Sequence, residues 1–178
     1  TTNNITYLED SGSNSTSSWA SNLSKGASNE SSQTLTFTVS NNNNALFSSQ
    51  PAINSSGTLT FTTASNKNGS ATVTVGLSDD GGTANGGVDT FPDQTFTITL
   101  TAVNDEPSFT KGSAEIVFED SGFNIYSDWA TSLSTGPSNE SDQILTFTVT
   151  NDNHSLFSSQ PVINSSGILS FNTASNAN

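Results

Sequence analysis

Cysteine, methionine and arginine are absent from this sequence of 178 residues, which contains three lysines and one histidine. Without cysteine the chain can form neither a disulfide bond nor a catalytic thiol, so sheet packing and bound ions remain as sources of stability. The formal net charge of −13 means that phosphate backbones and anionic lipid surfaces would repel the chain. These absences exclude a disulfide scaffold and predict that nucleic acid is not a partner.

Long hydrophobic runs are also absent. No apolar segment approaches the roughly 20 residues that a membrane-spanning helix needs, and the N-terminus has no basic segment followed by an apolar one. We therefore expect no membrane insertion, and if the protein is secreted, its signal lies outside this sequence.

Helix-forming residues are scarce, and threonine and serine fill segments that have a two-residue period. Phe96, Ile98 and Leu100 alternate with threonines, which predicts a strand with one face in a core and one in water. Residues 35–39 and 71–77 show the same alternation. Since only 30% of the residues are hydrophobic, the core must be thin. About seven short strands in the first hundred residues predict an all-β fold, a Greek-key β-sandwich.

The chain contains an internal repeat. Residues 8–68 align without a gap to residues 118–178, and roughly two-thirds of the aligned positions are identical, which indicates a tandem array. We expect a complete repeat in residues 1–106 and a partial one in residues 107–178, because the second copy lacks the equivalent of residues 69–110.

The partial repeat carries apolar strand residues for which the sequence supplies no partner strands: Leu145, Phe147, Val149, Leu156, Phe157, Leu169 and Phe171. Two explanations remain open. The chain is a fragment of a longer polypeptide, or a second chain donates the equivalents of residues 71–77 and 95–100 and so builds a filament.

Acidic residues gather where predicted strands end. Glu9 and Asp10 follow the first strand, and the last strand of the complete repeat delivers further oxygen ligands to the same end, namely Asn104, Asp105 and Glu106. Carboxylates this close repel one another unless a cation is present. Oxygen ligands without histidine or cysteine favour Ca²⁺ over Zn²⁺. The sequence therefore predicts a calcium site at this joint, with a solvated acidic joint that binds no ion as the alternative.

The second repeat carries the same acidic positions. Glu119 and Asp120 correspond to the first pair, and an extended strand of about 35 Å would bring them to the far end of their repeat. Glu30, whose counterpart is Glu140, precedes a predicted strand and is expected at the same end as Glu9. All of these residues are candidate calcium ligands.

A second candidate set is Asp79, Asp80 and Asp89, in a glycine-rich loop at the opposite end of the repeat. The segment that joins a preceding repeat would arrive at this end. Because aspartate and glycine are the ordinary residues of turns, a hairpin loop that binds no ion is the alternative.

Catalytic chemistry has little support. The single histidine, His154, replaces Asn44 of the other copy in a turn and has no partner for general-base chemistry. A carboxylate pair for glycoside hydrolysis needs one group in an apolar pocket, whereas these acidic residues lie among asparagine, glycine and serine. We expect that the protein is not an enzyme.

Several segments together resemble a known family: LF (46–47), SGTL (56–59), ATVTVGLSDDG (71–81), and TFTITLTAVNDEPSF (95–109). Their order is similar to that of the bacterial cadherin-like tandem repeats, of the VCBS type, in giant surface or secreted adhesins. The segments GxSNE, LFSSQP and GGTANGGVDT also resemble those repeats. The resemblance covers nearly the whole chain. It implies cadherin-like or immunoglobulin-like sandwiches and a role in calcium-stiffened extracellular adhesion or spacing. Animal cadherins differ, since they carry an acidic cluster where this chain has SNKN (65–68).

The expected function is a calcium-binding structural or adhesion repeat in a long extracellular protein at the cell surface or secreted. Its partners would be neighbouring repeats, with self-association or a cell-surface glycan or protein as further possibilities. A filament subunit is one alternative. A carbohydrate-binding module is another, although Trp19, Tyr126 and Phe91 are too scattered in the sequence to define a flat aromatic face.

Overall fold

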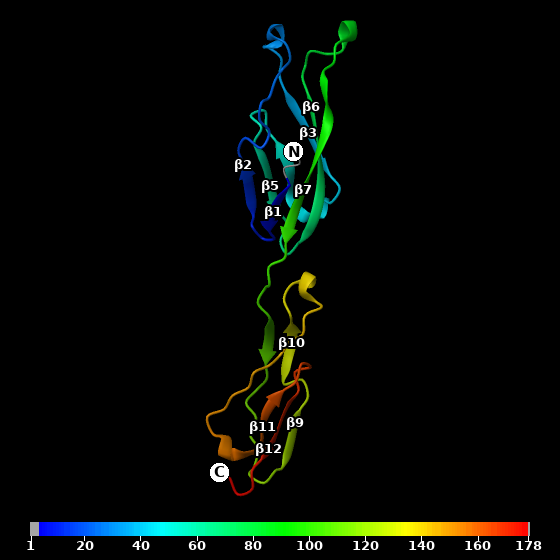
Figure 1. The fold of residues 1–178 in the computed structure, drawn as a ribbon. Helices are drawn as coiled ribbons and strands as arrows, with labels where there is room; N and C mark the ends of the chain where they lie inside the picture. The colour runs from blue at the N-terminus through cyan, green and yellow to red at the C-terminus, as the bar shows by residue number, and fades with distance from the viewer. Residues whose placement is uncertain (1–3, 178) are drawn as a thin grey trace. The chain divides into compact units, whose positions relative to one another are not determined.

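The computed structural model describes residues 4–177 and divides the chain into two compact units, residues 1–103 and 104–178. The described residues form strands joined by turns and by 3₁₀ helices of three residues each (Figure 1). This confirms the all-β class. No helix in the described part of the chain is long and apolar enough to cross a membrane.

The first unit contains two sheets. Its strands are β1 (Ile5–Leu8), β2 (Ser13–Thr16), β3 (Thr36–Asn41), β4 (Phe47–Ile53), β5 (Leu59–Thr63), β6 (Gly69–Ser78) and β7 (Thr90–Thr101). The larger sheet has the order β1-β7-β6-β3, and the smaller has the order β2-β5-β4. β1 pairs parallel to β7, and the other pairs in this unit are antiparallel.

The inward faces of both sheets form one hydrophobic core. Val73 and Ile98 of the larger sheet and Leu59 of the smaller sheet are 0% exposed. Burying each such side chain contributes about 1.5–3 kcal/mol to folding. Trp19 packs against this core, with its ring centroid 4.4 Å from that of Phe96. Trp19 therefore adds a partly buried aromatic side chain to this core.

Two strands of the smaller sheet, β4 and β2, have sequences that are unusual for strands. Pro51 lies in β4, which is an edge strand of its sheet, as expected for a residue that has no N–H for a ladder. β2 has the polar sequence SNST and forms a strand because its backbone pairs antiparallel with β5. The sequence SNST alone does not predict a strand at β2.

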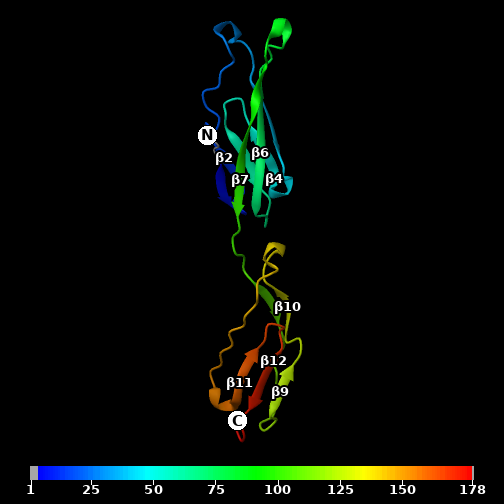
Figure 2. The ribbon, with the colours of Figure 1, turned by 45° about the vertical axis from the view of Figure 1, so that its right-hand side comes forward.

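The second unit contains β8 (Ser108–Lys111), β9 (Phe123–Tyr126), β10 (Ala130–Ser134), β11 (Phe157–Ile163) and β12 (Leu169–Thr173). β8 pairs with β10, and β11, β12 and β9 lie side by side in a second sheet (Figure 2). In the repeat alignment β9, β11 and β12 correspond to β2, β4 and β5. Residues 115–118 and 146–151, which correspond to β1 and β3, are not strands. In the first unit those two strands pair with β7 and β6, and the second repeat has no equivalent of either.

Large apolar side chains are exposed in this unit. Ile116 is 96% exposed, Phe118 is 89% exposed and Ile144 is 85% exposed. Their counterparts in the first repeat are Thr6, Leu8 and Thr34, which are also exposed. The second repeat therefore carries large apolar side chains at positions that face outward in both units.

Candidate metal centre

Glu9 is a buried carboxylate at the end of β7. It is only 2% exposed, although acidic side chains are rarely buried without partners. Its backbone N–H donates to the carbonyl oxygen of Thr101 at 2.9 Å, and its Oε1 accepts the N–H of Val103 at 2.8 Å. Because β1 runs parallel to β7, both strands end at the same edge of the sheet. The structure thus brings Glu9 to the end of the last strand, as the sequence predicts.

The aspartate after this glutamate fixes a turn in each repeat. Asp10 has a φ of 59° and Asp120 a φ of 60°, a left-handed conformation that aspartate tolerates better than most residues. Oδ1 of Asp10 accepts the N–H of Asn66 at 2.8 Å, and Oδ1 of Asp120 accepts the N–H of Asn176 at 2.9 Å. One oxygen of each carboxylate is therefore used by the fold, which leaves Oδ2 for an ion.

Glu119 differs from its counterpart Glu9, because its side chain is exposed. In the first unit the end of β7 covers the glutamate and supplies the N–H that it accepts. The second repeat has no equivalent of β7. Glu9 and Asp10 therefore lie beside the end of a last strand, whereas Glu119 and Asp120 have no such strand beside them in the described part of the chain.

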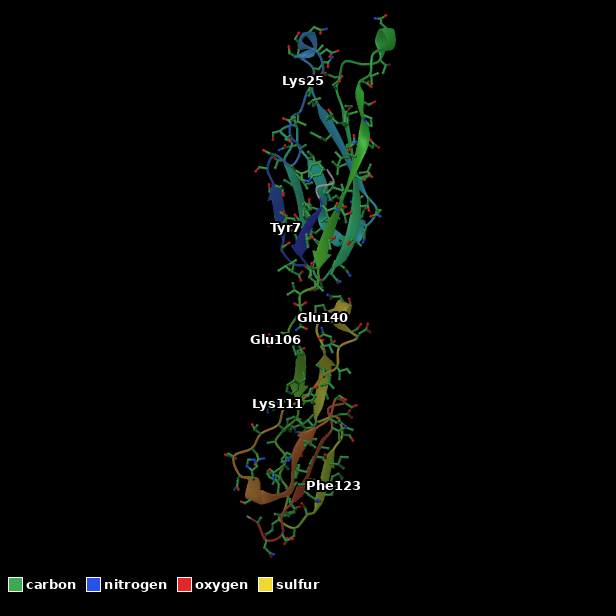
Figure 3. The ribbon with its side chains drawn as sticks, in the orientation of Figure 1. Tyr7, Lys25, Glu106, Lys111, Phe123 and Glu140 are labelled. Atoms are coloured by element: carbon green, nitrogen blue, oxygen red, sulfur yellow. The ribbon has the colours of Figure 1, made fainter. Side chains whose placement is uncertain are left out.

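Glu140 and Asp105 form the acidic group of the second unit. Glu140, labelled in Figure 3, ends the 3₁₀ helix η4 (Ser138–Glu140). Its side chain is 5% exposed. Its Oε1 accepts the backbone N–H of Asp105 at 2.8 Å. Oε2 of Glu140 and Oδ2 of Asp105 are both buried and have no hydrogen-bond partner among residues 4–177. Two neighbouring carboxylates thus each carry one buried oxygen that the described protein groups leave unsatisfied.

The unsatisfied oxygen of Glu140 has an origin in the sequence. In the first repeat the corresponding Glu30 uses Oε2 to accept the N–H of Ala27 at 2.7 Å. The residue at that position in the second repeat is Pro137, which has no N–H. The neighbouring Gly136 has a φ of 133°, and a Cβ atom at this position would collide with Oε2 of Glu140. The substitution of proline for alanine therefore removes the protein donor and leaves this oxygen available to another ligand.

Asn104 and Glu106, the other expected ligands of this segment, have different surroundings. Oδ1 of Asn104 accepts a hydrogen bond from Nε2 of Gln143 at 3.0 Å, and Nδ2 of Asn104 donates to the Asp105 carbonyl oxygen at 3.0 Å. Glu106 is exposed. Of the three residues, only Asp105 has a buried oxygen without a partner in the described part of the chain.

The expected position of Glu30 is wrong. It was expected beside Glu9, but it lies at the opposite end of the unit, where η1 (Ser28–Glu30) and η3 (Ala84–Gly86) both lie (Figure 1). β3 pairs antiparallel with β6, and the first residue of β3, Thr36, faces the last residue of β6, Ser78. The residues before β3 must therefore lie beside the residues after β6. Glu30 lines a groove of about 200 Å³ there together with Asp79 and Asp89.

Asp79, Asp80 and Asp89 hold the loop between β6 and β7 in place. The N–H of Asp79 donates to the carbonyl oxygen of Asp89 at 2.9 Å. Oδ1 of Asp79 accepts the N–H of Gly81 at 2.8 Å, and Oδ1 of Asp80 accepts the N–H of Thr34 at 2.8 Å. These bonds are those of an ordered turn and occupy one oxygen each of two carboxylates. A role of the three residues as calcium ligands stays a prediction.

Comparisons with protein-family models, with curated proteins and with solved structures found no match. The groups of the candidate centre are carboxylate and amide oxygens without histidine or cysteine, a donor set that suits hard cations such as Ca²⁺ and Mg²⁺ rather than Zn²⁺.

Proposed function

We propose that this chain consists of cadherin-like repeats that bind Ca²⁺ where one repeat joins the next, and that it serves as a stiffened spacer or adhesion segment in an extracellular protein. The observation that carries the proposal is the pair of buried oxygens, Oε2 of Glu140 and Oδ2 of Asp105, that lack a hydrogen-bond partner among the described residues.

A bound cation removes an energetic penalty at this pair. A buried acceptor without a partner costs about 1–3 kcal/mol, and more when the group is charged. Ca²⁺ takes six to eight oxygen ligands in flexible geometry, so it accepts carboxylates that are already partly used by backbone N–H groups. Mg²⁺ requires a near-octahedral site and gives up its waters reluctantly, and therefore fits this irregular donor set less well.

Covalent connection extends the ligand set. The N–H of Val103 is held by Glu9, and Asp105 follows only two residues later in the chain. Two residues of extended chain span at most about 7 Å, so the length of chain between Val103 and Asp105 permits a shared ion. We assign Oδ2 of Asp10 and the carboxylates of Glu9, Asp105 and Glu140 as the ligands of the joint.

Strand order supports the cadherin-like fold in this proposal, and the expected calcium affinity supports the extracellular location. Parallel pairing of β1 with β7 and the two sheet orders of the first unit fit a Greek-key sandwich of the cadherin-like type. Calcium sites in extracellular modules have dissociation constants of about 10⁻⁴–10⁻³ M and fill only where calcium is abundant, which favours the cell surface or a secreted protein. Neighbouring repeats of the same protein would be the principal partners.

Calorimetric titration with CaCl₂ tests the assignment of Glu140. We expect the unaltered chain to bind Ca²⁺ with a dissociation constant of about 10⁻⁴ to 10⁻³ M, and to bind Mg²⁺ more weakly. Glu140→Gln should weaken Ca²⁺ binding about tenfold or more, because it replaces a charged ligand with a neutral one.

The matched control is Glu115→Gln, which makes the same change at an exposed glutamate of the same unit. It should titrate like the unaltered chain. If both variants bind Ca²⁺ equally well, or if the unaltered chain shows no binding heat, the ligand assignment is wrong.

A further inference from the structure

A groove in the first unit has no occupant among the described residues, whereas the corresponding place in the second unit holds a strand. The groove has a volume of about 430 Å³, and its apolar lining comes from Trp19, Leu23, Phe37, Val75, Leu77 and Phe96. At about 30 Å³ for each water, this is room for roughly a dozen molecules, far more than a packing defect between side chains.

The second unit has a strand beside the corresponding segment. β8 pairs antiparallel with β10, with Lys111 facing Ala130 and Thr110 facing Thr131. The ring of Phe109 on β8 meets the ring of Phe147 edge-on, with the centroids 5.1 Å apart. An extended strand thus covers one flank of the repeat and places a phenylalanine against the inward face of the segment that corresponds to β3.

The first unit has counterparts of the residues that contact β8 in the second unit. In the repeat alignment Phe37 corresponds to Phe147, and residues 20–24 correspond to β10. Residues 20–24 do not form a strand, and three of the five are exposed. Ala130 is 2% exposed, whereas its counterpart Ala20 is only half-buried. Residues 20–24 of the first unit therefore lack, among the described residues, the paired strand that covers their counterparts in the second unit.

The surroundings of one carboxylate agree with a missing strand. Glu140 accepts the N–H of Asp105, three residues before β8, and its counterpart in the first unit is only half-buried.

From these contacts we infer that the groove of the first unit binds an extended peptide strand of the β8 type, the segment that joins one repeat to the next. Its phenylalanine lies against Phe37, and its backbone pairs antiparallel with residues 20–24. The register of the second unit sets the threonine of the strand opposite Ser21 and its lysine opposite Ala20. The aspartate before its proline donates a backbone N–H to Glu30. This inference does not require a bound ion.

The binding test uses a synthetic peptide with the sequence of residues 104–112, NDEPSFTKG, added to the full chain in EDTA. Fluorescence of Trp19, read in a Trp129→Phe background, reports occupation of the groove. We expect saturable binding of this peptide and a loss of at least tenfold in affinity when its phenylalanine is replaced by alanine. Binding of the alanine peptide with equal affinity, or no saturable binding at millimolar peptide, overturns the inference.

Variants of the chain locate the binding site. Leu23→Asp places a charge in the groove at a half-buried loop position and should abolish peptide binding. Leu8→Asp makes the same change at a leucine of the same unit that is 57% exposed and does not line the groove, and it should bind like the unaltered chain. Dimers of the chain that persist in excess peptide assign the groove to a second copy and overturn the inference.

A fused strand gives a readout that does not depend on variants in the groove. The seven residues NDEPSFT, placed directly before Thr1, continue the repeat alignment, since Lys111 corresponds to Thr1. We expect this extension to raise the melting temperature of the first unit by several degrees and to block binding of the free peptide, because a tethered strand has a high effective concentration. An unchanged melting temperature with full peptide binding contradicts the inference. Because the measurements are made in EDTA, their failure leaves the calcium proposal untouched.

Discussion

Leu59→Ala is expected to destabilise the first unit by about 3 to 5 kcal/mol, the range for removing a fully buried leucine from a packed core. Leu59 is 0% exposed and lies between the two sheets. For a unit of about 100 residues, the loss corresponds to a fall in melting temperature on the order of 20 °C. Urea unfolding followed by Trp19 fluorescence in a Trp129→Phe background measures it, because the chain has two tryptophans.

The matched control is Leu169→Ala, at the same position of the second repeat. Leu169 is 8% exposed, and the second repeat lacks the counterparts of β6 and β7 that complete the core around Leu59. Its replacement should reduce the stability of the second unit by less than half as much. Equal losses in the two units would contradict the conclusion that only the first repeat has a complete two-sheet core.

Glu9→Ala, measured in EDTA, is expected to reduce the stability of the first unit by about 2 to 4 kcal/mol. The change leaves the N–H of Val103 without the oxygen that it donates to at 2.8 Å and opens a cavity at a position that is 2% exposed. Hydrogen bonds to charged groups contribute about 1.5–3 kcal/mol, and an unsatisfied buried partner adds to the loss. Glu9→Gln should recover most of the stability, because the amide oxygen accepts the same hydrogen bond.

The control for this variant is Glu119→Ala. Glu119 is the counterpart of Glu9 but is exposed, so its replacement should change stability by no more than about 0.5 kcal/mol. Chemical denaturation of each variant gives both values. If Glu9→Ala is as mild as Glu119→Ala, the buried carboxylate does not hold the end of β7.

Strands with a clear two-residue period could be predicted from the sequence. The alternation in residues 35–39, 71–77 and 95–101 falls within or next to β3, β6 and β7. β2 was not predicted, because its sequence SNST has no apolar period and its conformation comes from pairing with β5. A signal was available, since its counterpart in the second repeat is FNIY, which alternates as a strand does.

The candidate site was predictable only in part. Convergence of Glu9 with the end of β7 follows from the order of strands along the chain, but the position of Glu30 depends on which strand β3 pairs with. That pairing joins residues about thirty to forty positions apart, and local periodicity does not report it. The unsatisfied oxygen of Glu140 follows from Pro137, which replaces Ala27 in the repeat alignment. The consequence of this replacement is known only from the structure, where the N–H of Ala27 donates to Oε2 of Glu30.

The proposal of a calcium-stiffened joint is decided by thermal melting of the unaltered chain in EDTA and in excess CaCl₂ at matched ionic strength. A ligand present at about 100 times its dissociation constant stabilises the folded state by about 2.7 kcal/mol. We therefore predict that calcium raises the melting temperature by on the order of 10 °C and that MgCl₂ has a smaller effect. Identical melting curves with and without calcium would contradict the proposal.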